Sequence, residues 1–134
     1  MTLRNSPMSQ SVLRRSILSL AVVLLSSHFA FAGEVIGEWA RSDGKGKVRF
    51  APCGTAVCGT LVWLKEPSDR AKIGQRVFFD MKPTGENVWA GTAFNPEDGK
   101  EYSGKMTLSG NSLVTAGCVF GGLICKSVSW TRVN

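Results

Sequence analysis

Four cysteines carry the most specific chemistry in the sequence, because their number and spacing suit two disulfide bonds. They occupy positions 53, 58, 118 and 125 of a 134-residue chain. Cys53 and Cys58 bracket a short loop between two strand-like segments. The other two cysteines are placed symmetrically about Gly121-Gly122, a dipeptide typical of a tight hairpin turn. We therefore expect Cys53 to pair with Cys58 and Cys118 to pair with Cys125.

Two other uses of these cysteines are weighed against disulfides. A zinc site built from all four would have gaps of four and six residues within the pairs, wider than most zinc knuckles have. A redox pair normally has the spacing Cys-x-x-Cys beside a βαβ unit, and neither feature is present. The sequence therefore predicts no metal site and no cofactor.

Acid-base catalysis lacks its usual side chain, because the one histidine of the chain, His28, falls in a segment that we expect to be removed. Nucleophilic systems that depend on histidine are then excluded. Carboxylates remain, and Asp80 and Glu66 are the candidates for a small carboxylate-dependent enzyme. Solvated acids in loops are ordinary, and nothing indicates a shared cleft. We expect the protein not to be an enzyme.

An oxygen-rich segment at Asn95–Lys100 suggests a calcium loop at first sight. Its spacing does not fit an EF-hand, and Asn-Pro followed by Asp98-Gly99 is typical of a hairpin connection. We interpret the segment as a turn.

Residues 1–32 have the three-part pattern of a secretory signal peptide. Three arginines precede the apolar run Ile17–Leu25, and the small residues Ala30 and Ala32 follow it. The run is too short and too interrupted for a membrane span of about 20 apolar residues. We expect cleavage after Ala32, a periplasmic or secreted product, residues 33–134 as one domain, and no stable membrane anchor after cleavage.

The charge of the remaining chain is modest. Removing residues 1–32 takes away three of the 16 cations and none of the ten acidic residues, which lowers the net charge from +6 to +3. The cations are spread along the sequence rather than gathered in a patch, so we expect no nucleic-acid partner.

Short β-compatible segments separated by turn residues recur throughout the predicted domain. Within Tyr102–Ser109, for example, Tyr102, Met106 and Leu108 alternate with polar residues, as in a half-buried strand. The eight predicted strands are Val35–Arg41, Gly46–Ala51, Cys58–Leu64, Arg76–Met81, Asn87–Phe94, Tyr102–Ser109, Ser112–Val119 and Ile124–Val133.

Eight consecutive strands joined by tight turns predict an all-β fold, an eight-stranded antiparallel up-and-down barrel, because closure leaves no unpaired edge. A two-sheet sandwich is the alternative. Such a barrel is filled by side chains or holds one small ligand. If it is hollow, we expect Phe50, Trp63, Tyr102 and Met106 to face inward and bind a small apolar ligand.

Gly37-x-Trp39 on the first strand and Arg132 near the end of the last resemble the lipocalin signature. In lipocalins such a tryptophan closes the barrel floor and the arginine lies across it. The resemblance implies that Gly37, Trp39 and Arg132 are structural residues. A guanidinium over an indole contributes about 0.5 to 2 kcal/mol.

The chain also resembles the secreted members of a bacterial family of unknown function, DUF2147, across the whole predicted domain. Six separated sequence blocks carry this resemblance: Gly37–Trp39, Pro52–Gly54 with Cys58-Gly59, Val62–Leu64, Asn95–Lys100 with Tyr102, Gly117-Cys118 and Trp130–Arg132. The segment between Pro67 and Gly74 is shorter than in many members. The family implies a lipocalin-like barrel exported to the periplasm and no particular activity.

Two functions from different classes remain open. The first is a non-catalytic periplasmic barrel that binds a small apolar or amphipathic ligand. The alternative is a filled barrel that acts as an envelope accessory module and contacts a protein partner through its loops, with Lys65–Gln75 the preferred segment. A large interior pocket favours the first, whereas a filled core with an exposed apolar patch favours the second.

Overall fold

The computed structural model describes residue 21 and residues 34–134. The predicted signal peptide, with its cleavage after Ala32, lies outside the described residues apart from residue 21. In the described part of the chain, no helix is long and apolar enough to cross a membrane.

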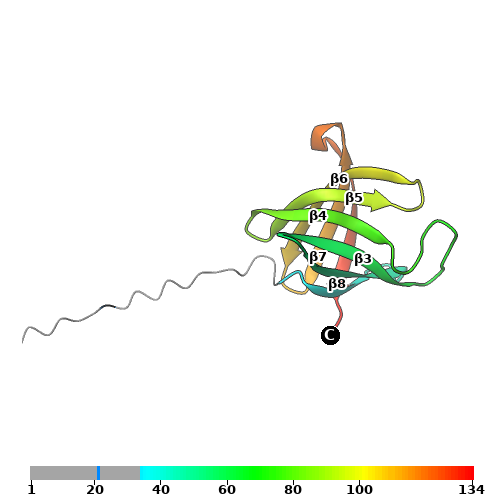
Figure 1. The fold of residues 1–134 in the computed structure, drawn as a ribbon, viewed down its shortest axis with the longest axis horizontal. Coiled ribbons are helices and arrows are strands. Elements are labelled where there is room, and N and C mark those ends of the chain that lie inside the picture. The colour runs from blue at the N-terminus through cyan, green and yellow to red at the C-terminus, as the bar shows by residue number, and fades with distance from the viewer. Residues whose placement is uncertain (1–20, 22–33) are drawn as a thin grey trace, which may run out of the picture.

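Residues 37–132 form a closed barrel in which each strand pairs antiparallel with the next and the first pairs with the last (Figure 1). The expected up-and-down barrel is therefore confirmed, and the sandwich is not formed. The strands are β1 Gly37–Arg41, β2 Gly46–Cys53, β3 Ala56–Leu64, β4 Arg76–Gly85, β5 Val88–Asn95, β6 Lys100–Ser109, β7 Ser112–Val119 and β8 Ile124–Arg132. A short 3-10 turn, η1 (Phe120–Gly122), connects β7 to β8.

Side chains on the inner face of the barrel pack into one core. On β6, Gly104, Met106 and Leu108 are buried while the residues between them are exposed, as the alternation predicts. The largest fully buried side chains come from five different strands: Trp39, Phe50, Met81, Trp89 and Met106. The interior is thus occupied by bulky side chains, the filled form of an eight-stranded barrel.

One end of the barrel is closed by Arg132, at the end of β8. Its Cζ lies 4.4 Å from the centre of the Trp39 ring on β1, and its Nη2 donates to the Glu34 carbonyl oxygen at 2.7 Å. The Trp39 Nε1 in turn donates to the Val35 carbonyl at 2.9 Å. This is the arrangement that the lipocalin-like signature implied for Trp39 and Arg132.

Strand β4 contains a bulge and runs farther than predicted, to Gly85 instead of Met81. Its register with β5 shifts between Phe79 and Lys82, where Asp80 adopts a φ of 49°. A Cβ placed on Gly91 of β5 would lie 2.6 Å from the Phe79 and Asp80 carbonyl oxygens. The bulge therefore depends on a glycine opposite it, because any side chain would displace the β4 backbone.

Candidate interaction surface

The four side chains expected to line a ligand cavity do not gather in one place. Phe50 and Met106 are fully buried in the core, and the Phe50 ring lies 5.3 Å from the ring of Phe78. Tyr102 is half-buried and Trp63 is 42% exposed. Phe50 and Met106 therefore fill the barrel rather than line an open cavity.

The expected inward orientation of Trp63 is wrong. In the pairing of β2 with β3, Lys47 is opposite Trp63 but Val48 is opposite Leu61, so Val62 is an extra residue on β3. This bulge reverses the alternation after Leu61. Trp63 shares the outer face with Lys47, whose Nζ lies 5.7 Å from the indole centre, and Leu64 packs against the core instead.

Tyr102 lies at the start of β6, next to the β5–β6 loop. Its ring packs over Gly117 of β7, where an added Cβ would lie 3.2 Å from the Tyr102 Cβ. Its hydroxyl donates to Asp98 Oδ2. This hydrogen bond lowers the pKa of Asp98 and raises the pKa of Tyr102, because it stabilises the carboxylate and the neutral phenol.

The Asn95–Lys100 segment forms a turn whose side chains bind its own backbone. Asn95 Oδ1 accepts from the Glu97 N–H at 3.0 Å, and Asp98 Oδ1 accepts from the Lys100 N–H at 2.9 Å. Gly99 has a φ of 68°. The Asn95 and Asp98 side-chain oxygens, two of the three groups that suggested calcium, are thus engaged in hydrogen bonds of the turn.

The two acids considered for catalysis lie in unlike surroundings. Glu66 is exposed in the β3–β4 loop. Asp80 is exposed at the β4 bulge, with a carboxylate oxygen within 4.8 Å of the sulfurs of Cys53 and Cys58. Those sulfurs are joined to each other in a disulfide, so neither offers a thiolate ligand to a metal.

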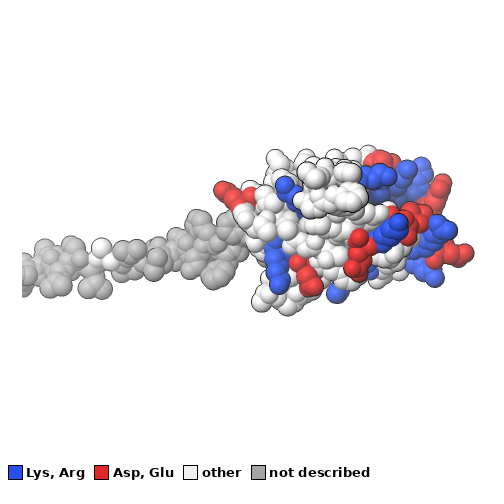
Figure 2. Space-filling view, turned by 90° about the horizontal axis from the view of Figure 1, so that it is seen from above, with Lys and Arg blue, Asp and Glu red and all other residues white. Residues whose placement is uncertain are grey.

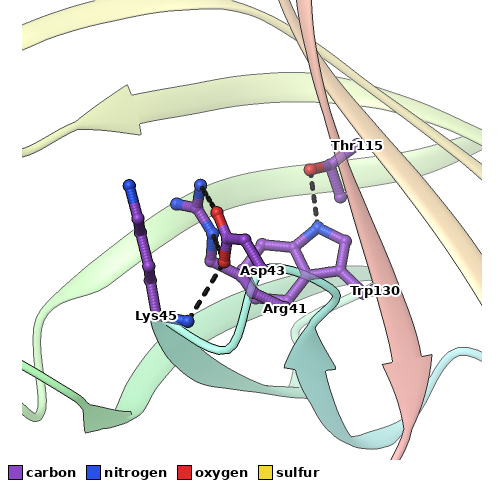
Figure 3. Close-up of polar contacts among 5 residues, drawn as sticks. All are labelled: Arg41, Asp43, Lys45, Thr115 and Trp130. Atoms are coloured by element: carbon purple, nitrogen blue, oxygen red, sulfur yellow. Dashed lines mark hydrogen bonds and ion pairs between the residues drawn. The ribbon is translucent and has the colours of Figure 1, made fainter.

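An ion pair and a cation–π contact organise the β1–β2 turn beside Trp130 (Figure 3). The Arg41 guanidinium lies 5.9 Å from the Trp130 ring centre and 2.9 Å from Asp43 Oδ2. Slight burial raises the pKa of Asp43, but the hydrogen bonds from Arg41 and the Lys45 N–H outweigh it, so the net pKa is lowered. These contacts give the Arg41 and Asp43 side chains a structural role in the turn.

The second disulfide marks the place where one hairpin leaves the barrel. Cys118 pairs with Cys125 across β7 and β8, as the sequence predicts, and the last β6–β7 pair is Ser103 with Cys118. Beyond it, residues 119–124 have no partner on β6. Figure 1 shows this hairpin standing away from the rest of the barrel. We call residues 119–124 the tip.

The tip exposes three large apolar side chains close together in sequence. The exposed fractions are 74% for Phe120, 86% for Leu123 and 60% for Ile124. Seen from the side of the tip, uncharged atoms cover the centre of the molecule, whereas most charged side chains gather toward one edge (Figure 2). Exposed apolar side chains that cluster in this way typically mark an interaction surface.

Backbone geometry explains why these side chains point outward. Gly121 and Gly122 have φ values of 66° and 92°, and the Leu123 N–H donates to the Phe120 carbonyl at 3.3 Å, as in a primed hairpin turn. Phe120 also has a positive φ of 54°, and Leu123 is αR. Both residues thus leave the extended conformation, and their side chains do not fold back on the strands.

A cleft of about 290 Å³ lies beside the tip, on the outer face of the barrel. Its walls are formed by β4 to β8 and the turn glycines: Thr84, Ala90, Ser103, Gly104, Lys105, Cys118, Gly121, Gly122 and Cys125. The lining includes one lysine and two hydroxyl side chains and no acidic residue. The cleft is therefore separate from the filled interior, and the charged residue in its lining is a cation.

The segment around Gly121-Gly122 was predicted only as a turn, and the exposed surface of the tip was not predicted. A signal was nevertheless present. All four residues that flank the glycine pair are apolar (Val119, Phe120, Leu123 and Ile124), and the alternation of a strand cannot turn them all to one buried face. The preferred contact segment, Lys65–Gln75, has one large exposed apolar side chain, Ile73, at 59%.

The closed eight-stranded barrel, with arginine over tryptophan at its floor, defines a lipocalin-like protein. The chain belongs to the DUF2147 family, described as uncharacterized proteins conserved in bacteria, whose model matches residues 37–132. Among solved structures it is similar to protein HP1028 of Helicobacter pylori, described as belonging to the lipocalin family, with a TM-score of 0.61 and 20% identity. The match covers 75% of this chain and 84% of that one. No curated protein matches the chain significantly.

Proposed function

We propose that this protein is a non-catalytic accessory module of the bacterial envelope that docks onto another envelope component through the tip of its β7–β8 hairpin. The observation that carries this proposal is the exposure of Phe120, Leu123 and Ile124 beyond a disulfide at the base of the hairpin. A crosslinked hairpin loses little conformational freedom on binding, which lowers the entropic cost of association.

Export to the periplasm or cell exterior is part of this proposal. Two disulfides suit an oxidising compartment, and the first 32 residues have the pattern of a cleavable signal. A barrel crosslinked twice and closed at its floor is a suitable rigid support for one projecting loop.

The absence of catalysis is also proposed. Residues 33–134 contain no histidine, and of the two candidate acids Asp80 lies beside a disulfide while Glu66 is in an exposed loop. An enzyme would need convergent acid and base groups in one cleft, and the cleft beside the tip has no acidic side chain.

Binding of a small ligand inside the barrel receives less support. Of the four side chains predicted for it, two are fully buried in the core and one faces outward. The cleft described above lies on the outer face, against the tip. Ligand binding is therefore better placed at the hairpin than in the interior.

Photo-crosslinking in intact cells tests the docking proposal. A photoreactive amino acid replaces Leu123 in the exported protein, and a matched variant carries it at Ile73, an exposed apolar position in the β3–β4 loop. We expect a specific adduct with an envelope component from position 123 and none from position 73. Equal labelling from both positions, or none from 123, would contradict docking through the tip.

A further inference from the structure

We propose that the component bound by the tip is the surface of an anionic lipid bilayer, into which Phe120, Leu123 and Ile124 insert while flanking lysines contact the headgroups. This inference rests on the proposed function and names the chemistry of its partner. The resulting association is peripheral and reversible, because three apolar side chains bury far less than a membrane span.

The first support is the distribution of charge. All three net positive charges of residues 33–134 come from residues 102–134, which contain Lys105, Lys126 and Arg132 and no acidic residue. Residues 33–101 contain ten cations and ten acids. Of these three cations, Lys105 and Lys126 lie by the tip, whereas Arg132 lies at the barrel floor. Lysines beside an apolar tip are attracted to anionic lipids.

The second support is the position of the lysines relative to the tip. Lys105 lines the cleft on the outer side of the barrel. Lys126 follows Cys125 directly, so its exposed side chain leaves the opposite face of the β7–β8 ribbon. A lysine therefore lies on each face at the base of the tip, where the headgroups of a bilayer would be if the tip pointed into it.

A further lysine extends this surface across the sheet. Lys82 on β4 pairs with Ala90 on β5, and Ala90 pairs with Lys105 on β6, so the three residues form one row on the outer face. Lys82 and Lys105 are both exposed. The row lies beside the cleft, whose Ser103 and Thr84 hydroxyls are hydrogen-bond donors suited to a phosphate.

The dimensions also fit. Ile124 is two residues from Lys126 on extended β8, which at about 3.3 Å per residue places it roughly 7 Å farther out, and Leu123 lies beyond it in the turn. Interfacial segments bury their apolar face about 5 to 10 Å into the boundary between headgroups and acyl chains. With Lys126 at the phosphates, the Phe120, Leu123 and Ile124 side chains would reach this depth.

The convex shape of the tip favours a bilayer over a protein partner. Its apolar side chains project from a single turn that stands away from the barrel (Figure 1). A protein would need a matching concave pocket to cover them, whereas acyl chains rearrange around any projecting shape. A protein partner is retained as an outcome of the test.

Vesicle sedimentation tests the inference with the exported protein, whose N-terminus is first determined by mass spectrometry because a retained leader would itself bind lipid. The probes are phosphatidylethanolamine vesicles containing phosphatidylglycerol and, for comparison, neutral phosphatidylcholine vesicles. We expect binding to the anionic vesicles that weakens as salt is added, and little binding to the neutral ones. Equal binding to both, or none to either, would overturn the inference.

Matched variants locate the contact. Leu123→Asp should lower the partition coefficient roughly tenfold or more, whereas Ile73→Asp, at an exposed apolar site away from the tip, should not change it. Lys126→Glu should lower it about fivefold or more, and Lys65→Glu should have little effect. The substituted positions are all exposed, and thermal melts of each variant verify that the fold is intact. If Leu123→Asp bound as well as the parent protein, the tip would not be the inserting element.

The remaining outcomes separate this inference from the proposed function. A lipid adduct from position 123 in cells, together with vesicle binding, supports both. A protein adduct from position 123 without vesicle binding overturns the lipid partner but retains docking through the tip. Saturable binding of soluble glycerol phosphate without vesicle binding would assign the cleft to a free anion and likewise overturn the lipid partner. No adduct and no vesicle binding would refute both.

Discussion

Arg132 and Trp39 join the two ends of the barrel: the arginine Cζ lies 4.4 Å from the indole centre, although 93 positions separate the residues. The same guanidinium donates to backbone or side-chain oxygens of Glu34, Gly110 and Asn111. One side chain therefore connects the segment before β1, the β6–β7 turn and the floor of the core. Closure of the barrel depends on this contact as well as on the β1–β8 pairing.

Arg132→Ala should lower the free energy of unfolding by about 1 to 3 kcal/mol, because the cation–π contact and several hydrogen bonds are lost together. Arg132→Lys should recover only part of the loss, since an ammonium group, unlike the planar guanidinium, cannot stack on the indole. Urea unfolding measures both changes. The control is Arg49→Ala, which removes an exposed ion pair to Glu38 and should cost less than about 1 kcal/mol. Equal losses for Arg132→Ala and Arg49→Ala would refute the closing role.

Two buried tryptophans should respond differently to replacement by phenylalanine. The Trp130 Nε1 donates to Thr115 Oγ1 at 2.9 Å, and Thr115 is itself buried. The Trp89 Nε1 is buried and has no hydrogen-bond partner in the described part of the chain. Trp130→Phe should therefore cost about 1 to 3 kcal/mol more than Trp89→Phe, as it leaves a buried hydroxyl unpaired. Thermal or urea unfolding measures the difference, and the opposite order would show that the Trp89 indole N–H has a partner.

The β4 bulge predicts a strong effect at one glycine and almost none at another. Gly91→Ala should destabilise the protein by several kcal/mol or prevent folding, because the new Cβ would lie 2.6 Å from two backbone oxygens that cannot move independently. Gly85→Ala, at the end of the same hairpin, meets nothing within 4 Å and should change stability by less than about 1 kcal/mol. The yield and the melting temperature of the two variants measure the difference. A well-folded Gly91→Ala protein would show that β5 does not approach the β4 bulge as closely as described.

Tyr102 can be titrated without interference, because it is the only tyrosine of the chain. Its phenolate absorbance should appear at a pH above the ordinary tyrosine midpoint of about 10, since the hydrogen bond to Asp98 favours the neutral phenol. Asp98→Asn should move the midpoint back toward that value, whereas Glu101→Gln should move it less. A parent midpoint at or below the ordinary value would contradict the hydrogen bond.

The hydrogen bond between Tyr102 and Asp98 also makes the stability of the fold depend on pH in the acid range. The pKa of Asp98 is lower in the folded protein than in the unfolded chain. The ionised carboxylate therefore contributes to the free energy of unfolding above its unfolded-state pKa, and this contribution is lost as the pH falls through its folded-state pKa. Asp98→Asn should remove this acid dependence from unfolding curves measured across the carboxylate range.

Several features of this protein follow from local sequence, because each depends on residues close together in the chain. Alternation and turn residues predicted eight strands and their order, and all eight are present with ends that differ by a few residues. The placement of cysteines about short loops predicted both disulfide pairs for the same reason. The lack of histidine after residue 32 was readable from the sequence directly.

Tertiary structure decided what the sequence left open, namely which faces the side chains occupy and what remains uncovered. The extra residue Val62 is recognisable only once β3 is paired with β2, and it turns Trp63 outward. Phe50 and Met106 fill the interior because the inner faces of the strands converge on them, which no single strand reveals. The tip became a surface only because β6 ends its pairing at Cys118, so that no neighbouring strand covers Phe120, Leu123 and Ile124. Local patterns specify strands and turns, whereas coverage and register are properties of the closed barrel.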